Sequence, residues 1–224
     1  MTKIYKSDEG ARAVRERYLE MLKRWPAPNE QMRVPTRQGE TFIIACGEKA
    51  ARPLLLFHGS ASNSAMWMGD VRAWAEHYRV YSIDLIGEAG LSAPARPPLA
   101  SEEYALWLDN VLKALSVTHA SIVGVSLGGW LALDYSTRQP ESVEFLFLIH
   151  ENFRPRIIKH PIFSDEALQR LTMPVMAVLG VRTYFWILPG RSVGSSATCR
   201  KPISVISLKP GTSFRDKRPP SLTS

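Results

Sequence analysis

The sequence predicts one α/β domain with a mainly parallel, doubly wound β-sheet covered by helices on both faces. Apolar runs of strand length alternate with segments of helical periodicity along most of the chain, and this alternation is what builds parallel sheets. Some runs, such as RPLLLFHG at 52–59, are apolar nearly throughout, as expected for strands buried on both faces. A length of 224 residues suits a single sizeable core.

The expected elements follow in a definite order. An amphipathic helix over 8–25 has apolar side chains at spacings of three and four and is stopped by the PAP sequence. Two strands, 31–36 and 41–47, then surround a turn. Further strands are expected at 52–59, 79–85, 120–126, 143–149 and 173–180, and further helices at 63–78, 101–115 and 127–138. In such sheets the chemistry gathers at the carboxyl ends of the strands.

Charge is distributed very unevenly along the chain. Residues 1–180 hold 20 Lys+Arg and 20 Asp+Glu, whereas residues 181–224 hold 8 Lys+Arg and one Asp. The net charge of +7 therefore comes entirely from the tail. We divide the chain into an α/β domain, 1–180, and a basic, irregular tail, 181–224, although ISVISL at 203–208 has the alternation of a strand that could replace one in the sheet.

Composition narrows the function classes. Two cysteines, Cys46 and Cys199, form neither a disulfide framework nor a metal-site spacing, and we expect no cofactor and no metal. No apolar run is long enough to span a bilayer, and the N-terminus lacks the apolar segment of a signal peptide, which favours the cytoplasm. A basic tail that binds nucleic acid or a membrane has only its charge in its favour, so we expect neither partner. No oligomeric state follows from the sequence.

The chemistry is concentrated in GVSLG, residues 124–128, between an expected strand and an expected helix. This G-x-S-x-G pattern is typical of a sharp turn that presents a nucleophilic serine. Gly124 and Gly128 would leave room for the turn, and Ser126 would stand exposed in a strained backbone conformation. The alternative is a plain glycine-rich turn before a helix.

Two other stretches favour the nucleophile over the plain turn. His58 and Gly59 end an earlier strand, and Asp84 ends the next one before a glycine-containing loop. With His-Gly, Asp-x-x-Gly and Gly-x-Ser-x-Gly in this order, residues 30–180 resemble the α/β-hydrolase superfamily, and most closely its small bacterial carboxylesterase-like members.

The resemblance implies a serine hydrolase acting on a small ester or similar acyl substrate. Ser126 would be the nucleophile, and the backbone N–H groups of Leu127 and of Ser60 (or Ala61) would form the oxyanion hole. His58 and Asp84 would be structural residues of the loops. A dehalogenase-type hydrolase would instead require Asp at position 126.

The general base and its acid partner are not found at the positions that the resemblance implies. They should follow the strand 173–180 and a later strand, but VRTYFWILPGR after Gly180 has no carboxylate and no histidine follows His160. Glu151 with His150 or His160 is a substitute pair at the edge of the sheet. Without such a pair we expect impaired turnover, and the second hypothesis is an inactive chain of this fold.

A slip of the reading frame after Gly180 would explain the missing residues. Because Trp has a single codon, the alternative frame requires Leu across Phe185–Trp186 and Asp across Trp186–Ile187. With permitted choices for the free letters, that frame encodes an Asp, a helix and a Gly-His pair. Since the tail 181–224 departs from the resemblance, we also expect the last helix and strand of the fold to be lost. A further departure is the short connection of 24 residues between the strands 143–149 and 173–180, which predicts a short or missing lid.

Overall fold

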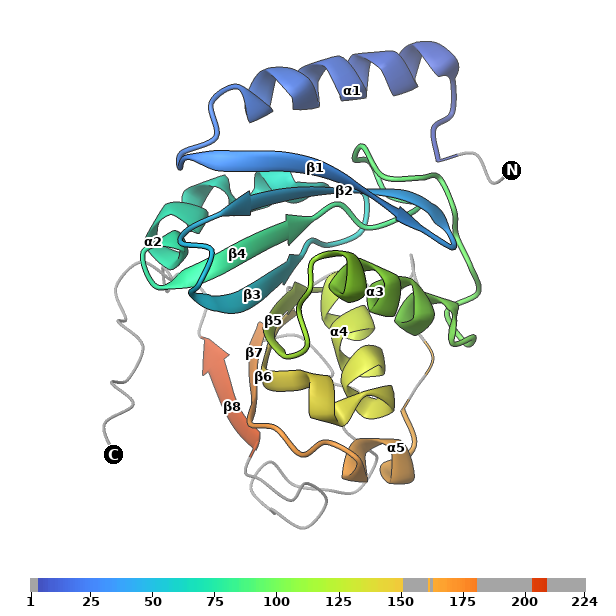
Figure 1. The fold of residues 1–224 in the computed structure, drawn as a ribbon. Coiled ribbons are helices and arrows are strands. Elements are labelled where there is room, and N and C mark those ends of the chain that lie inside the picture. Colours follow the sequence, from blue (N-terminus) through green and yellow to red (C-terminus); the bar gives the residue numbers. More distant parts are fainter. Residues whose placement is uncertain (1–3, 151–160, 162, 181–202, 209–224) are drawn as a thin grey trace.

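The computed structural model describes residues 4–150, 161, 163–180 and 203–208 as one eight-stranded sheet with helices on both faces (Figure 1). The α/β class predicted from the sequence is therefore confirmed. The strands are β1 Asn29–Thr36, β2 Gly39–Cys46, β3 Arg52–Phe57, β4 Tyr78–Ile83, β5 Ala120–Val125, β6 Val143–His150, β7 Val175–Gly180 and β8 Ile203–Leu208.

The strand order in the sheet is β1-β2-β4-β3-β5-β6-β7-β8. β2 is antiparallel to both β1 and β4, and all pairs from β4 to β8 are parallel. The parallel part places the ends of β3, β4, β5 and β6 at one edge, where loops from different parts of the chain meet. That edge is where the serine of the G-x-S-x-G pattern lies.

The helical elements are α1 Asp8–Leu22, η1 Ser64–Gly69, α2 Val71–Ala75, α3 Glu103–Ala114, α4 Leu127–Arg138, η2 Pro140–Ser142 and α5 Asp165–Gln169. The single helix expected over 63–78 is wrong in detail, because a 3₁₀ helix and a short α-helix replace it. The side chain of Asn63 caps η1 by accepting from the Ala65 N–H at 3.1 Å. Gly69, a poor helix former, ends η1 before Asp70.

Two apolar clusters cover the opposite faces of the sheet. Successive residues of β3 alternate between them, with Leu55 and Phe57 in one and Leu54 and Leu56 in the other. Helices α3 and α4 supply side chains to the first cluster, and α1, η1 and α2 supply side chains to the second. The period of two along each strand thus produces a sheet that is buried on both sides.

Part of the tail belongs to the sheet. Within 181–224 the structure describes residues 203–208, which form β8 and pair in parallel with β7. The strand predicted for ISVISL is confirmed, and these six residues are not irregular. The remaining tail and most of the short connection after β6 lie outside the described residues. Across the described part of the chain, no helix has both the length and the apolar character that a membrane span requires.

Candidate active site

Ser126 stands at the turn between β5 and α4 in a strained conformation. Its φ of 52° and ψ of −113° lie in a region that costs a non-glycine residue on the order of 1–3 kcal/mol. Its backbone N–H donates to the Ile149 carbonyl at 3.0 Å, and its own carbonyl accepts from the Trp130 N–H at 3.0 Å. The turn is thereby tied to β6 on one side and to the first turn of α4 on the other.

Glycines make this turn sterically feasible. A Cβ atom on Gly124 would lie 2.5 Å from the Gly128 carbonyl oxygen, and one on Gly128 would lie 2.5 Å from the His58 carbonyl oxygen. Both obstacles are backbone atoms, which cannot swing aside as a side chain could. The two positions therefore allow α4 to lie against the carboxyl ends of β3 and β5.

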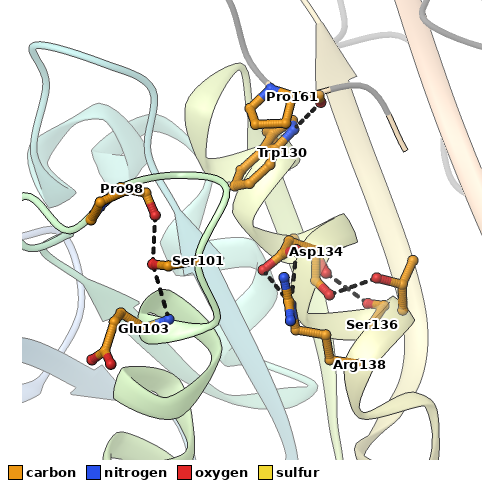
Figure 2. A network of polar contacts seen from close by, with 10 residues as sticks. Pro98, Ser101, Glu103, Trp130, Asp134, Ser136, Arg138 and Pro161 are labelled. Carbon is orange, nitrogen blue, oxygen red and sulfur yellow. Dashed lines mark hydrogen bonds and ion pairs between the residues drawn. The ribbon is translucent and has the colours of Figure 1, made fainter. Parts of the chain in front are cut away.

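Beyond the turn, α4 makes a polar contact to residue 161 and carries an ion pair along its own length (Figure 2). Trp130 Nε1 donates to the Pro161 carbonyl at 2.9 Å, and Arg138 Nε contacts both carboxylate oxygens of Asp134 at 3.0 and 3.1 Å. The ring of Trp130 also stacks on Phe163, with centroids 5.4 Å apart. The contacts of Trp130 join α4 to residues 161 and 163, whereas the Arg138–Asp134 pair lies within the helix, one turn apart.

Residues 58–64, here called the β3 loop, run past the serine. A Cβ on Gly59 would lie 3.6 Å from the Ser126 Cβ, so any side chain at this position would be in van der Waals contact with Ser126. The N–H of Ala61 donates to a Glu88 carboxylate oxygen at 2.5 Å. No described residue accepts from the N–H groups of Ser60 or of Leu127, the first residue of α4.

His58 is fully buried and bonded to backbone on both sides. Its Nε2 accepts from the Leu85 N–H at 2.9 Å, so Nδ1 carries the proton and donates to the Gly59 carbonyl at 2.8 Å. Burial lowers the pKa of this imidazole, while the nearby Asp84 charge acts in the opposite direction. A neutral ring with both nitrogens engaged braces the loop and is not free to take a proton from Ser126.

Asp84 has no exposed surface and joins three segments of the chain. One carboxylate oxygen accepts from the Tyr18 hydroxyl at 2.9 Å and from the Ser64 N–H and hydroxyl at 2.9 and 2.7 Å. The other accepts from the Leu91 N–H at 2.8 Å. Burial, followed by the Asp84 charge, raises the pKa of Tyr18. The Asp84 carboxylate thus accepts four hydrogen bonds and has a structural role, because it links these segments.

The other histidines whose side chains the structure describes lie at the opposite edge of the sheet. His77 immediately precedes β4 and His119 immediately precedes β5, whereas Ser126 follows β5. A six-residue strand spans about 20 Å, which is too far for a proton transfer. His150 ends β6, next to the Ile149 carbonyl that accepts from Ser126, and Glu151 and His160 lie outside the described residues.

Sequence reasoning missed Glu88, which is 8% exposed and contacts the β3 loop. Its neighbours Gly87 and Ala89 do not resemble a buried strand, so no periodicity indicates its burial. The only feature of the sequence that could have indicated a role for Glu88 is its position four residues after Asp84.

Comparison with known proteins agrees with this geometry. The family model of the alpha/beta hydrolase fold matches residues 52–171, which is more than half of the chain. The chain therefore belongs to the alpha/beta hydrolase fold family.

Within this family it is a carboxylesterase-like protein. It is 30% identical to the uncharacterized carboxylesterase nap of Bacillus subtilis over 213 residues, which cover 94% of this chain and 66% of the relative. It is 35% identical to carboxylesterase YbfK of Bacillus subtilis over 148 residues, which cover 64% of this chain and 50% of the relative. The chain thus spans less than two thirds of the length of either relative.

Solved structures share the fold. The crystal structure of carboxylesterase CesB (YbfK) from Bacillus subtilis superposes with a TM-score of 0.73 at 23% identity, covering 90% of this chain and 91% of that chain. The naproxen esterase of Bacillus subtilis gives a TM-score of 0.72 at 22% identity, with 92% of each chain covered.

Proposed function

We propose that the chain is a serine hydrolase of the carboxylesterase type, which attacks a small ester or similar acyl substrate through a Ser126 acyl-enzyme. The observation that carries the proposal is the backbone of Ser126, held at φ 52° between β5 and α4. Strain of this kind persists where surrounding structure imposes it and is common at functional sites. The carboxylesterase relatives support an ester as the substrate class.

The reaction follows from the groups around the serine. The Ser126 hydroxyl oxygen adds to the ester carbonyl carbon, and the carbonyl oxygen becomes an oxyanion. The N–H groups of Ser60 and Leu127 are the donors that would receive it, because neither has a partner among the described residues. Collapse of this intermediate breaks the bond to the alcohol oxygen, which takes up a proton in place of the one that the Ser126 hydroxyl released. The acyl group stays on Ser126, from which water later releases it as the acid.

The proton of the serine requires an acceptor. Among the histidines whose side chains the structure describes, His58 cannot serve, since both ring nitrogens are bonded to backbone, and His77 and His119 lie at the far edge of the sheet. The substitute pair of Glu151 with His150 or His160 consists of side chains outside that description, and adjacent side chains such as His150 and Glu151 seldom both face one serine. We propose that turnover by this chain is therefore impaired, with a residual rate on the order of a thousandfold over water from the oxyanion hole and binding. The second candidate, an inactive chain of the same fold, differs in lacking serine-dependent turnover altogether.

Release of p-nitrophenol from p-nitrophenyl acetate tests the proposal. Ser126→Ala should abolish the enzymatic part of the release, because the turn between β5 and α4 carries no other hydroxyl or thiol. Ser121→Ala, near the start of β5 and therefore at the opposite end of the strand that leads to Ser126, is the matched control and should retain the wild-type rate. Equal rates for the wild-type chain and Ser126→Ala would refute the proposed nucleophile, and turnover at an ordinary enzyme rate would refute the impairment.

A further inference from the structure

A second loop supports the β3 loop from the side. Residues 84–92, here called the β4 loop, contact it at several points. The Asp84 carboxylate holds Ser64, and the Ala89 carbonyl accepts from Asn63 Nδ2 at 2.9 Å. Both contacts lie at the far end of the β3 loop, near the start of η1. The third contact, from Glu88 to the Ala61 N–H, lies one residue from Ser60.

The Glu88 side chain is committed to this contact. One carboxylate oxygen accepts from the Ala61 N–H at 2.5 Å, and the other lies 3.6 Å from Arg96 Nη2. Arg96 is itself anchored, because its Nε donates to the Gly87 carbonyl at 2.6 Å. The Glu88 side chain is thus only 10% exposed to water. Its carboxylate points one oxygen toward the Ala61 N–H and the other toward Arg96.

The Ala61 backbone needs such an external restraint. Its φ of 55° places an ordinary L-residue in the left-handed region, which is uncommon for alanine. Rotation of the peptide group between Ser60 and Ala61 would relieve that conformation. It would also turn the Ser60 carbonyl oxygen toward Glu88, where two negative ends would meet. An ionised carboxylate therefore favours the observed peptide orientation twice, by accepting from the N–H and by repelling the carbonyl.

We propose that Glu88 is a positioning residue for the oxyanion hole, which locks the Ser60–Ala61 peptide group and leaves the Ser60 N–H as the donor of the β3 loop. The inference rests on the proposed hydrolase function. Glu88 itself does not touch the substrate; it acts through Ala61. Because Glu88 already accepts from the Ala61 N–H, the Ser60 N–H is the one of these two neighbours that can donate to the oxyanion.

The charge state of Glu88 makes the device sensitive to pH. Burial raises the pKa of this carboxyl, and the Ala61 N–H and Arg96 partly offset the rise. The other titratable groups that respond to its charge are Tyr104 of α3, whose pKa is raised to about 12 mainly by burial, and Tyr5, which precedes α1. Protonation of Glu88 removes the charge that resists the peptide rotation but leaves an acceptor oxygen, so positioning weakens as the pH falls through its raised pKa.

Acylation of Ser126 measures the consequence for reactivity. The rate constant is followed with p-nitrophenyl acetate and, independently, by labelling with a fluorophosphonate. Glu88→Ala should lower it about 10-fold, less than the roughly 100-fold loss typical of deleting an oxyanion donor itself. Glu88→Gln should retain more of the rate, because its amide oxygen still accepts from Ala61, and should lose the acidic limb of the pH profile. Glu141→Gln, an exposed glutamate of η2, should match the wild type.

The Ala61 amide resonance supplies a readout that does not depend on catalysis. In the ¹⁵N-labelled full chain its proton shift should titrate with Glu88, and the titration should vanish in Glu88→Gln. If Ser126 is acylated at the wild-type rate in Glu88→Ala, or if the Ala61 amide shift does not change with pH, the inference about Glu88 is wrong while the proposed function stands. A wild-type Ser126 that does not react with either probe would refute the proposed function and the catalytic part of the inference together.

Discussion

At the scale of single residues, the turn at Ser126 requires two glycines, because a Cβ atom at either position would collide with backbone. Gly124 and Gly128 face backbone carbonyl groups at distances that no Cβ atom tolerates, and Ser126 keeps a conformation that its own side chain disfavours. The stability that this turn costs must be recovered from the packing of β5 and α4. A glycine that faces backbone and one that faces open space should therefore respond oppositely to the same substitution.

Gly124→Ala tests this argument. Its Cβ would press on the Gly128 carbonyl, so α4 would have to shift, and we expect the free energy of unfolding to fall by about 1–3 kcal/mol. Ser126 acylation should fall with it. Urea denaturation gives the first quantity and fluorophosphonate labelling the second.

Gly69→Ala is the matched control, because a Cβ there meets nothing within 4 Å. It should leave stability unchanged or raise it by up to about 1 kcal/mol through the unfolded state. Equal stability of the two variants would contradict the steric account of the turn.

At the scale of elements, α1 is attached to the sheet through a buried polar contact as well as through apolar packing. Tyr18 and Leu22 lie in the apolar cluster of that face, and the Tyr18 hydroxyl reaches Asp84 at the end of β4. The same carboxylate holds Ser64 at the start of η1. The N-terminal helix is thereby coupled to the β3 loop, which passes Ser126, and to the β4 loop.

Tyr18→Phe removes that coupling without changing the shape of the core. The buried Asp84 carboxylate would lose one of its donors, which costs about 1–3 kcal/mol, measured as the shift of the urea unfolding midpoint. Tyr78→Phe is the control, since no described residue accepts from the Tyr78 hydroxyl, and it should be nearly neutral. An equal effect of the two substitutions would remove the case for a structural role of the Tyr18 hydroxyl.

Elements were the easiest part of the fold to predict from the sequence. Long buried strands such as β3 and β5 have a clear apolar signal, and PAP ends α1 close to the expected place. The division of 63–78 into η1 and α2 was missed because Gly69 is followed by residues that continue the helical pattern. The burial of Glu88 was missed for another reason: it depends on contacts with Ala61 and Arg96, which no repeating pattern in the sequence relates to position 88.

At the scale of the whole molecule, the charge break at residue 181 separates two kinds of sequence. β8 shows that six residues beyond this break pair with the sheet. Strand pairing needs an alternating apolar segment of the right length, which ISVISL provides, and it does not need the acid or the histidine that catalysis requires. The pairing of β8 with β7 therefore says nothing about whether the chain supplies the acid and the base.

The proposal that residues 181–224 arise from a shifted reading frame leads to a direct prediction. The gene should encode, in the alternative frame after codon 180, an Asp soon after β7 and a Gly-His pair further on. A chain translated in that frame should hydrolyse p-nitrophenyl acetate several powers of ten faster than the present chain, because it regains a general base.

Sequencing the gene and assaying the reframed chain are the two measurements. The reframed chain carrying Ser126→Ala is the control and should be inactive. A nucleotide sequence that is incompatible with the Asp and the Gly-His in that frame would end the proposal.

The sequence by itself determined the α/β class, the order of the strands along the chain, and the position of Ser126 between a buried strand and a helix. These properties depend on local periodicity and on glycines at fixed spacing, both of which can be read along the chain. Only the tertiary structure decided that His58 is bonded on both ring nitrogens, that Asp84 joins three segments, and that Glu88 holds Ala61. Each of these depends on contacts between loops that the parallel sheet brings to one edge, and such contacts leave no periodic trace in the sequence.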